Sequence, residues 1–360
     1  MKFPTSVNYN THLAYKPNPA IETKRKLKAE LFEWDFNIPK PLILVDNITS
    51  NIFWKRCYKS RFTDSPLLTE DKRWLNVFME RHFADFLENL NPRLYDPEKV
   101  TTLVKLCSPF IENLSIRSLI PCDIPVQRMT SPEMAHLITT QQRDGISQTK
   151  NKKDISRDHI SLHAALGSLS NLVELHITYQ LQNIGIEYRK DQFQFTNNDA
   201  RNLARGLEKC GRLKILRYHC KIGDDGASSI AKFMIKRDAL RSVILADNVF
   251  GPSGVESISH ALNHPGCGVR NLDLRLNIKL GSEGIAHIAV AIARGCNLTS
   301  LNISGCGITQ GPLEKPPAGV WSTTSAESPP TCGELLARAI GLVKTPLRLL
   351  HPHNLISIHT

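Results

Sequence analysis

One short apolar pattern recurs along the chain and restricts its fold more than any other feature. Apolar residues occupy the first, fourth and sixth positions of each copy, a spacing typical of a short strand with one buried side. The last four copies begin 27, 29 and 29 residues apart, so each copy belongs to a larger repeating unit. The five copies are Leu172, Leu175 and Ile177; Leu213, Leu216 and Tyr218; Leu240, Val243 and Leu245; Val269, Leu272 and Leu274; and Leu298, Leu301 and Ile303.

A helical pattern follows the strand pattern in these units. After a shared glycine, apolar residues face one side of a helix, as in Ile285, Ile288 and Ile292. One strand–turn–helix unit cannot bury both of its apolar faces, whereas stacked units can. The units resemble leucine-rich repeats, and their length of about 28 residues is similar to the ribonuclease-inhibitor-like subclass. We therefore predict an α/β fold, a leucine-rich repeat solenoid (ribonuclease-inhibitor-like) preceded by a small mainly helical domain.

A polar position follows each strand, three residues beyond the last apolar one. Asn248 and Asn277 occupy it in two units, and we expect their amides to pair with backbone groups of the buried turn. Leaving such groups unpaired would cost about 1–3 kcal/mol each. Cys306 is a weaker substitute in the last unit. Lys221 cannot accept a hydrogen bond, so its shorter unit is expected to be locally distorted.

Composition shifts divide the chain around these repeats. We expect a flexible N-terminal extension at 1–40, a mainly helical domain at 41–139, a polar basic linker at 140–158, the repeats at 159–310, a Pro/Ser-rich insertion at 311–331, and a partial or truncated last repeat at 332–360. In the last segment, Leu336, Ala339 and Ile340 keep helical spacing, and Leu347 and Leu350 would open another strand.

A longer gap separates the first two strand patterns. This gap carries Tyr188, Phe193 and Phe195. A helical stretch follows, which Asn197, Asn198 or Asp199 would cap. Its apolar positions are Ala200, Leu203, Ala204 and Leu207. The aromatics either pack on the convex side of the solenoid or form a docking loop.

The formal net charge of +11 favours acidic partners, without choosing among nucleic acid, an anionic membrane and an acidic protein. The stretch "NIFWKRCYKSRF" mixes aromatic and basic residues, which is either a nucleic-acid contact or an amphipathic helix with a solvated basic face. No apolar run approaches the length of a membrane span, and the start is not a secretory signal. The nine cysteines lack CxxC pairs, so reduced thiols inside the cell fit best.

No catalytic motif stands out, and we expect neither an enzyme nor a cofactor. GxxxxGK[ST], GxSxG, HExxH and CxxC are absent from the sequence. Asp224 and Asp225 lie where a repeat turns into its helix, so helix capping explains them better than acid–base chemistry. His351 and His353 alone make a weak metal site.

The strand side chains between the apolar ones predict a binding surface. Because successive side chains of a strand point to opposite faces, the apolar ones enter the core and the ones between them face the concave side of the solenoid. The candidate partner-binding residues are Glu174, His176, Arg217, His219, Asp247, Asp273, Arg275 and Asn302, with Ser242, Ile244 and Ser304 beside them. This polar face of mixed charge suits a protein partner. The alternative is that the face is only solvated and that the N-terminal region or the convex helices carry the contacts.

Two regions together resemble one known family. The stretches "FWKRCYKSRF" and "FMERHFADFLENLNPRLYDPEKVTTLVKLC", followed by "FQFTNNDARNLARGLEKCGRLKILR" and "KIGDDGASSIAKFM", resemble the t-complex-associated testis-expressed protein 1 family, a leucine-rich repeat subunit of the nexin–dynein regulatory complex. The resemblance covers roughly residues 40–310. The chain departs from the family in its basic linker and in its shortened C-terminal repeats.

The resemblance implies a structural role in the axoneme of motile cilia and flagella, where the complex links neighbouring doublets. The implied partners are other dynein regulatory complex subunits and, directly or indirectly, axonemal microtubule doublets, with no nucleic acid and no membrane span. The implied location is the cytoplasm, the cytoskeleton and the ciliary or flagellar axoneme, with a part in sperm motility.

Two other functions remain open at this point. One is a soluble cytoplasmic leucine-rich repeat regulator, either an inhibitor or a Ran-type GTPase-activating protein, although that type typically carries an acidic tail. The other is a basic RNA- or membrane-associated adaptor, whose binding would fall steeply as salt rises.

Overall fold

The computed structural model describes residues 49–64, 66, 72–88, 97–118, 159, 161–178, 196–314, 316, 329–342 and 348–350. The expected extension 1–40 and linker 140–158 lie outside these residues. The same holds for most of the expected insertion and for the residues Tyr188, Phe193, Phe195, His351 and His353. The chain divides into two compact units, Met1–Phe78 and Met79–Thr360.

Helix α2 (Asn51–Arg61) and the first residues of α3 (Trp74–Glu88) form the described part of the first unit. Asn51 Oδ1 accepts a hydrogen bond from Trp74 N at 2.7 Å. The first residue of one helix thus satisfies a backbone donor at the start of the next, where no intrahelical partner exists.

An aromatic cluster forms the core of this first unit. The Trp54 ring lies 5.3 Å from the Phe78 ring, and the Tyr58 ring lies 5.7 Å from the Trp74 ring. Trp54 and Tyr58 are 0% and 2% exposed, so they are not available to stack on bases. The basic residues of α2 are exposed, which supports the solvated amphipathic helix; they are Lys55, Arg56, Lys59 and Arg61.

Within the described part of the second unit, seven parallel strands form one sheet in chain order, β1 to β7. The strands are β1 Asn113–Ile116, β2 Glu174–Thr178, β3 Ile215–His219, β4 Ser242–Ile244, β5 Asn271–Asp273, β6 Ser300–Asn302 and β7 Arg348–Leu350. The helices are α4 Pro97–Cys107, α6 His163–Leu166, α7 Asn197–Leu207, α8 Asp224–Met234, α9 Pro252–Leu262, α10 Gly281–Ala293 and α11 Cys332–Gly341, with 3-10 turns η3 Ser108–Phe110 and η5 Ile278–Leu280.

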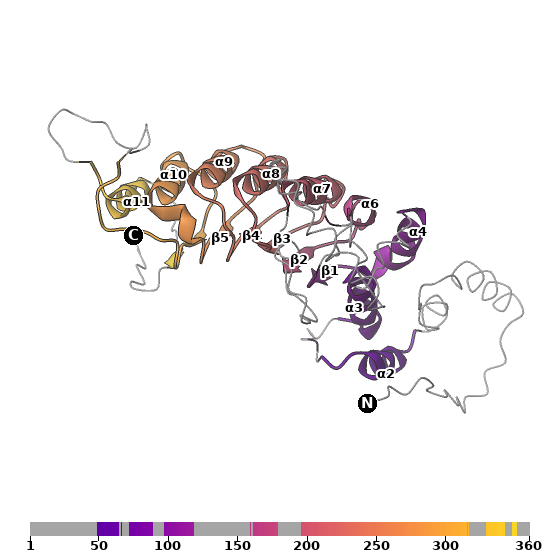
Figure 1. Ribbon diagram of the computed structural model, residues 1–360. Helices are drawn as coiled ribbons and strands as arrows, with labels where there is room; N and C mark the ends of the chain where they lie inside the picture. Colours follow the sequence, from indigo (N-terminus) through magenta and orange to yellow (C-terminus); the bar gives the residue numbers. More distant parts are fainter. Residues whose placement is uncertain are drawn as a thin grey trace, which may run out of the picture. The chain divides into compact units, whose positions relative to one another are not determined.

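Helices α6 to α11 lie in a row along one side of the strands (Figure 1). Packed helices are about 8–10 Å apart, whereas paired strands are about 4.7–4.9 Å apart. The side without helices is therefore the inner, concave one. This arrangement is the predicted leucine-rich repeat solenoid.

The sheet begins one strand earlier than the repeat pattern predicted. Strand β1 pairs in parallel with β2, and Leu114 is the register partner of Leu175. Ile111, Leu114 and Ile116 have the same spacing as the later strands, and each is at most 1% exposed. The signal was present in the sequence, on the N-terminal side of the expected linker.

The predicted apolar positions of strands and helices meet in one core. In α10, Ile285, Ile288 and Ile292 are at most 2% exposed, and the corresponding residues of α8 and α9 are also buried. Burying one such side chain contributes about 1.5–3 kcal/mol. The helical periodicity is confirmed, and it is what attaches each helix to the sheet.

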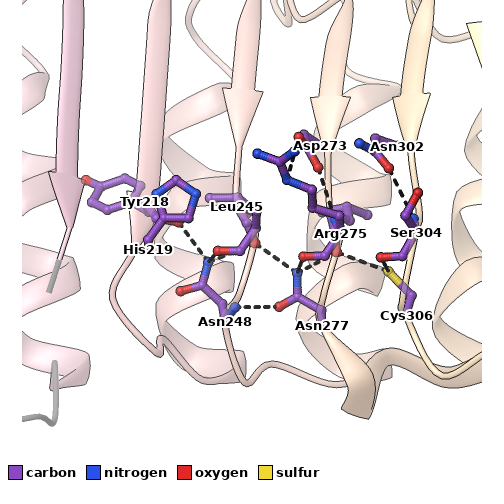
Figure 2. Close-up of polar contacts among 12 residues, drawn as sticks. Tyr218, His219, Leu245, Asn248, Asp273, Arg275, Asn277, Asn302, Ser304 and Cys306 are labelled. Carbon is purple, nitrogen blue, oxygen red and sulfur yellow. Dashed lines mark hydrogen bonds and ion pairs between the residues drawn. The ribbon is translucent and has the colours of Figure 1, made fainter. Parts of the chain in front are cut away.

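Buried amides cross the turns between strands and helices, as the sequence predicted (Figure 2). Asn277 Nδ2 donates to the carbonyl oxygens of Leu245 at 2.8 Å and Leu274 at 2.6 Å. Asn248 Nδ2 donates to Leu245 O and to Tyr218 O at 2.9 Å. Each amide therefore joins its own turn to the preceding one, and we call this set, extended by Cys306, the asparagine ladder.

The ladder residue of the first regular unit differs from the expected one. Cys220, not Lys221, is buried there, and its Sγ donates to Ile177 O at 3.4 Å. Cys306 Sγ donates in the same way to Leu274 O at 3.0 Å. Lys221 is exposed with φ 55°, because the shorter unit shifts the ladder position back by one residue. The expected distortion is present, but the aligned residue was wrong.

Two further details correct the sequence analysis. Helix α7 is capped by Thr196, whose Oγ1 accepts from Asp199 N at 3.0 Å, rather than by Asn197, Asn198 or Asp199; Asp199 completes a reciprocal capping box. At the other end, strand β7 forms, but Leu349 is the register partner of Leu301. The apolar register is therefore shifted by one residue from the expected Leu347 and Leu350.

Candidate functional site: the concave face

The strand residues that alternate with the buried apolar ones form a continuous surface on the concave face. Their side chains are partly exposed and alternate with buried ones, as in Glu174 to Thr178 of β2. Register partners align one of them from each of β1 to β6 in a central column. This column consists of Ser115, His176, Arg217, Ile244, Asp273 and Asn302.

An ion pair joins β2 to β3 on this face. Arg217 Nε donates to Glu174 Oε1 at 2.7 Å, and both side chains are about one-third exposed. The two residues lie diagonally, because Glu174 is the register partner of Ile215. At this exposure the pair contributes about 0.2–1 kcal/mol to stability, so its main effect is to neutralise the surface.

Two histidines lie beside this ion pair. His176 Nε2 is 3.3 Å from His219 Nδ1, so one ring donates a hydrogen bond to the other. Burial lowers the pKa of both histidines, and mutual repulsion with Arg217 lowers that of His176 further. Both rings are therefore neutral at pH 7 and present polar, uncharged groups.

The C-terminal strands repeat a second local arrangement. Asp273 Oδ1 accepts from Arg275 N at 3.1 Å, and its Oδ2 lies 3.4 Å from Arg275 Nε. In β6, Asn302 Oδ1 accepts from Ser304 N at 3.1 Å (Figure 2). The same backbone geometry thus holds a charged pair in one unit and a neutral one in the next.

Asp247 and Arg275 lie just beyond the ends of their strands, unlike the other six candidates. Strand β4 ends at Ile244, and Asp247 follows in the turn with φ 54°. Its Oδ1 lies 2.5 Å from Lys221 Nζ, and both side chains are about half exposed. Six of the candidates thus form three pairs, which are Glu174 with Arg217, His176 with His219, and Asp273 with Arg275. Asp247 forms a fourth pair with Lys221 at the edge of the face.

Apolar residues exposed beside the concave face were missed by the sequence analysis. Leu276 is 54% exposed and Ile278 is 74% exposed. Leu276 has φ 61°, a left-handed backbone where Asp247 and Gly305 occur in the neighbouring units. A leucine there costs about 1–3 kcal/mol. The signal that would have found it is an apolar residue directly before the ladder asparagine, outside the repeat pattern.

Asp224 and Asp225 lie in the first turn of α8, where the prediction placed them, but Asp224 caps the next helix and not its own. Asp224 Oδ1 accepts from Gly251 N at 2.6 Å and Gly254 N at 3.0 Å, at the start of α9. Asp225 Oδ2 accepts from Asn197 Nδ2 at the start of α7. A Cβ on Gly254 would lie 2.8 Å from Asp224 Oδ1, so a larger residue there would displace the carboxylate.

A buried ionisable pair was also missed. His159 Nδ1 lies 2.6 Å from Asp199 Oδ2, and His159 N donates to Asp199 Oδ1 at 2.8 Å. His159 and Asp199 are 2% and 6% exposed. The pair fastens the segment before the repeats to the start of α7, which is a structural role.

Burial raises the pKa of every described thiol. The eight described cysteines are unpaired and buried. Burial raises the pKa of Cys107 and Cys332 to about 12 and that of Cys306 to about 11, so none of these three is a thiolate at neutral pH. Among the described residues no group of three potential metal ligands comes together. None of the described helices has the length and apolar character to cross a bilayer.

Comparisons with known proteins agree with the fold. The family model described as "Leucine Rich repeat" matches residues 217–231 and 296–310. Dynein regulatory complex subunit 5 of Macaca fascicularis is 28% identical over 263 residues, covering 72% of this chain and 50% of that protein. The Mus musculus protein of the same name is 28% identical over 227 residues, covering 61% and 43%. NACHT, LRR and PYD domains-containing protein 6 of Rattus norvegicus is 27% identical over 145 residues, covering 40% and 15%.

The extent of these matches distinguishes the relatives. The macaque match is longer than the whole stretch from β1 to β7, so it extends beyond the repeats, whereas the rat match is shorter than that stretch. The chain spans about half the length of the dynein regulatory complex proteins that it matches. The chain is therefore a leucine-rich repeat protein similar in sequence to dynein regulatory complex subunit 5.

Proposed function

We propose that this protein is a non-enzymatic structural subunit of the dynein regulatory complex in ciliary or flagellar axonemes. The observation that carries the proposal is the match to dynein regulatory complex subunit 5 over 72% of the chain, because it includes residues outside the repeats. Repeats alone occur in proteins of many functions. The subunit would act as a scaffold that supports motility, located in the cytoskeleton of the cilium.

The concave face has the chemistry of a protein contact surface. Its charged residues are paired with one another, as in Arg217 with Glu174 and Arg275 with Asp273. A face without excess charge suits a polar protein surface better than phosphates or an anionic membrane. Its partners would be other subunits of the complex and, directly or through them, microtubule doublets.

Leu276 is the residue on which the contact is proposed to depend most. Its left-handed backbone is unfavourable for leucine, and its side chain is more than half exposed. If this position served only the fold, glycine would suit its left-handed backbone better, as Gly305 does in the next unit. Together with Ile278 it provides an apolar anchor beside the polar face, the combination seen at protein interfaces.

The test uses tagged protein in a motile ciliated cell. Cilia are extracted with detergent and then with high salt, and the axonemes are crosslinked. We expect retention with the axoneme and crosslinks to dynein regulatory complex subunits. Complete release by detergent would contradict the proposal and favour the soluble regulator. Retention only at low salt, with RNA or lipid recovered, would favour the basic adaptor.

A pair of variants tests the interface separately from stability. Leu276→Gly is expected to keep or raise the unfolding temperature, because glycine suits the left-handed backbone, and yet to weaken axonemal retention. Leu342→Ala is the matched control, since Leu342 is 69% exposed at the end of α11. Equal retention of both variants would remove Leu276 from the interface.

A further inference from the structure

A groove opens between α7 and α8, on the helical side of the solenoid and away from the concave face. Its volume is about 540 Å³. Five of its nine lining residues are cationic, and Glu208 is the acidic one. The cations are Arg201 and Arg205 of α7, Lys232 of α8, and Lys236 and Arg237 just after α8. We call this feature the basic groove.

The cations of the basic groove are not neutralised within the described chain. None of the five forms an ion pair with a described residue, whereas Arg217, Lys221 and Arg275 on the concave side each lie beside a carboxylate. The C-terminal ends of two helices supply about half a negative charge each. With Glu208 included, about three positive charges remain uncompensated. Helix-end stabilisation therefore does not account for the whole cluster.

One cation of the basic groove is held in place on an apolar floor. The Arg237 guanidinium lies 5.0 Å from the centre of the Phe233 ring, and its Nη2 donates to Glu208 O. Phe233 is 6% exposed, and Ala204 lines the floor beside it. A guanidinium fixed in this way loses little entropy on binding a carboxylate, which it can contact in a bidentate manner.

We propose that the basic groove binds an acidic segment of a protein partner, with carboxylates on the cationic rim and an apolar side chain against the half-buried Ala204 of the floor. Nucleic acid fits less well, because Phe233 is buried and covered by Arg237, so no lining ring is open for base stacking. Carboxylates match the planar arginine forks at the rim. The proposal concerns a different surface from the concave face and does not depend on membership of the dynein regulatory complex.

The test measures binding of a fluorescent peptide to the purified full chain by anisotropy. The probe is a short run of glutamates interrupted by one leucine, and its control is the same peptide with glutamines. The glutamate peptide is expected to bind and the glutamine peptide is not. Raising the salt from about 50 to about 300 mM should weaken binding without abolishing it, since screening acts on the rim and not on the apolar floor.

Charge-matched variants locate the site. Arg205→Glu with Lys232→Glu reverses two rim charges, and Lys279→Glu with Arg294→Glu makes the same change in net charge at exposed residues outside the groove. We expect the groove variant to bind about tenfold more weakly and the control to bind within about twofold of the unchanged protein. Arg205→Gln with Lys232→Gln repeats the test without introducing repulsion, and circular dichroism checks that every variant is folded.

Three outcomes would overturn the proposal. One is unchanged binding by the groove variant. A second is an equal loss in both charge-reversed variants, which would mean that net charge alone attracts the peptide. The third is tighter binding of a labelled oligouridine than of the peptide, lost in the groove variant, which would make the groove a nucleic-acid site.

Discussion

The backbone N–H of Asn248 donates to Oδ1 of Asn277 at 3.1 Å, so that the side chain of one repeat satisfies the main chain of the repeat before it. Asn248 does the same for its predecessor, since its Oδ1 accepts from Cys220 N and Ile222 N at 3.2 Å each. The asparagine ladder is therefore a coupling between repeats as well as a filling of each turn. Solenoid stability depends on such nearest-neighbour terms.

Replacing Asn277 with alanine should destabilise the solenoid strongly. The change leaves Asn248 N without its acceptor and removes a donor from Leu245 O and Leu274 O. We expect the free energy of unfolding to fall by about 3 kcal/mol, since each buried unpaired group costs about 1–3 kcal/mol and water relieves part of this cost. Urea unfolding measures the change. Asn302→Ala is the control with an expected loss below about 1 kcal/mol, and equal losses would refute the ladder's role.

Stability should also fall at alkaline pH because of buried thiols. Burial raises the folded pKa of Cys332 from 9.0 to about 12. Its contribution is fully present below the unfolded pKa of 9.0 and is lost as pH rises toward 12. Between pH 7.5 and 10 we expect a loss of about 1 kcal/mol from this thiol. Urea unfolding of Cys332→Ala across the same range should show a flatter profile, and an unchanged slope would contradict the assignment.

The fold was predictable where the physics is local. The spacing of Leu272 and Leu274, and the helical spacing of Ile285 and Ile288, follow from side-chain direction alone, so strands, helices and their stacking could be derived. The first strand was missed only because Leu114 is far in sequence from the next copy. The ladder position at Cys220 could not be derived, since its unit is two residues shorter than the next two and its spacing leaves two candidates that only packing decides.

The candidate surfaces depended more on tertiary structure. The alternation along β2 placed Glu174 and His176 on one side, but their partners Arg217 and His219 lie diagonally, which requires the strand register. Arg201 and Arg205 are spaced by four residues and are visible as a basic stripe. They become one side of a groove only because α7 packs against α8.

The histidine pair on the concave face should titrate below the ordinary range. Burial lowers the pKa of His176 and His219 from 6.5, with repulsion from Arg217 and Arg275 adding to it. For a depressed histidine pKa, stability is present above the unfolded value of 6.5 and is lost as pH falls through it. NMR titration of the ring protons should give both midpoints below 6.5, and a midpoint above this value for either ring would contradict the geometry.

Asp199 should be among the residues least tolerant of substitution. Its carboxylate accepts from Thr196 N, His159 N and His159 Nδ1, at 2.9, 2.8 and 2.6 Å, inside the protein. Removing one partner of a buried ionisable pair costs about 3–5 kcal/mol. We expect Asp199→Ala to lose about that much in urea unfolding and to raise hydrogen exchange at the start of α7. Asp225→Ala, an exposed carboxylate with one amide donor, should lose less than about 1 kcal/mol. If the two variants lose the same stability, His159 and Asp199 do not hold the start of α7 as described.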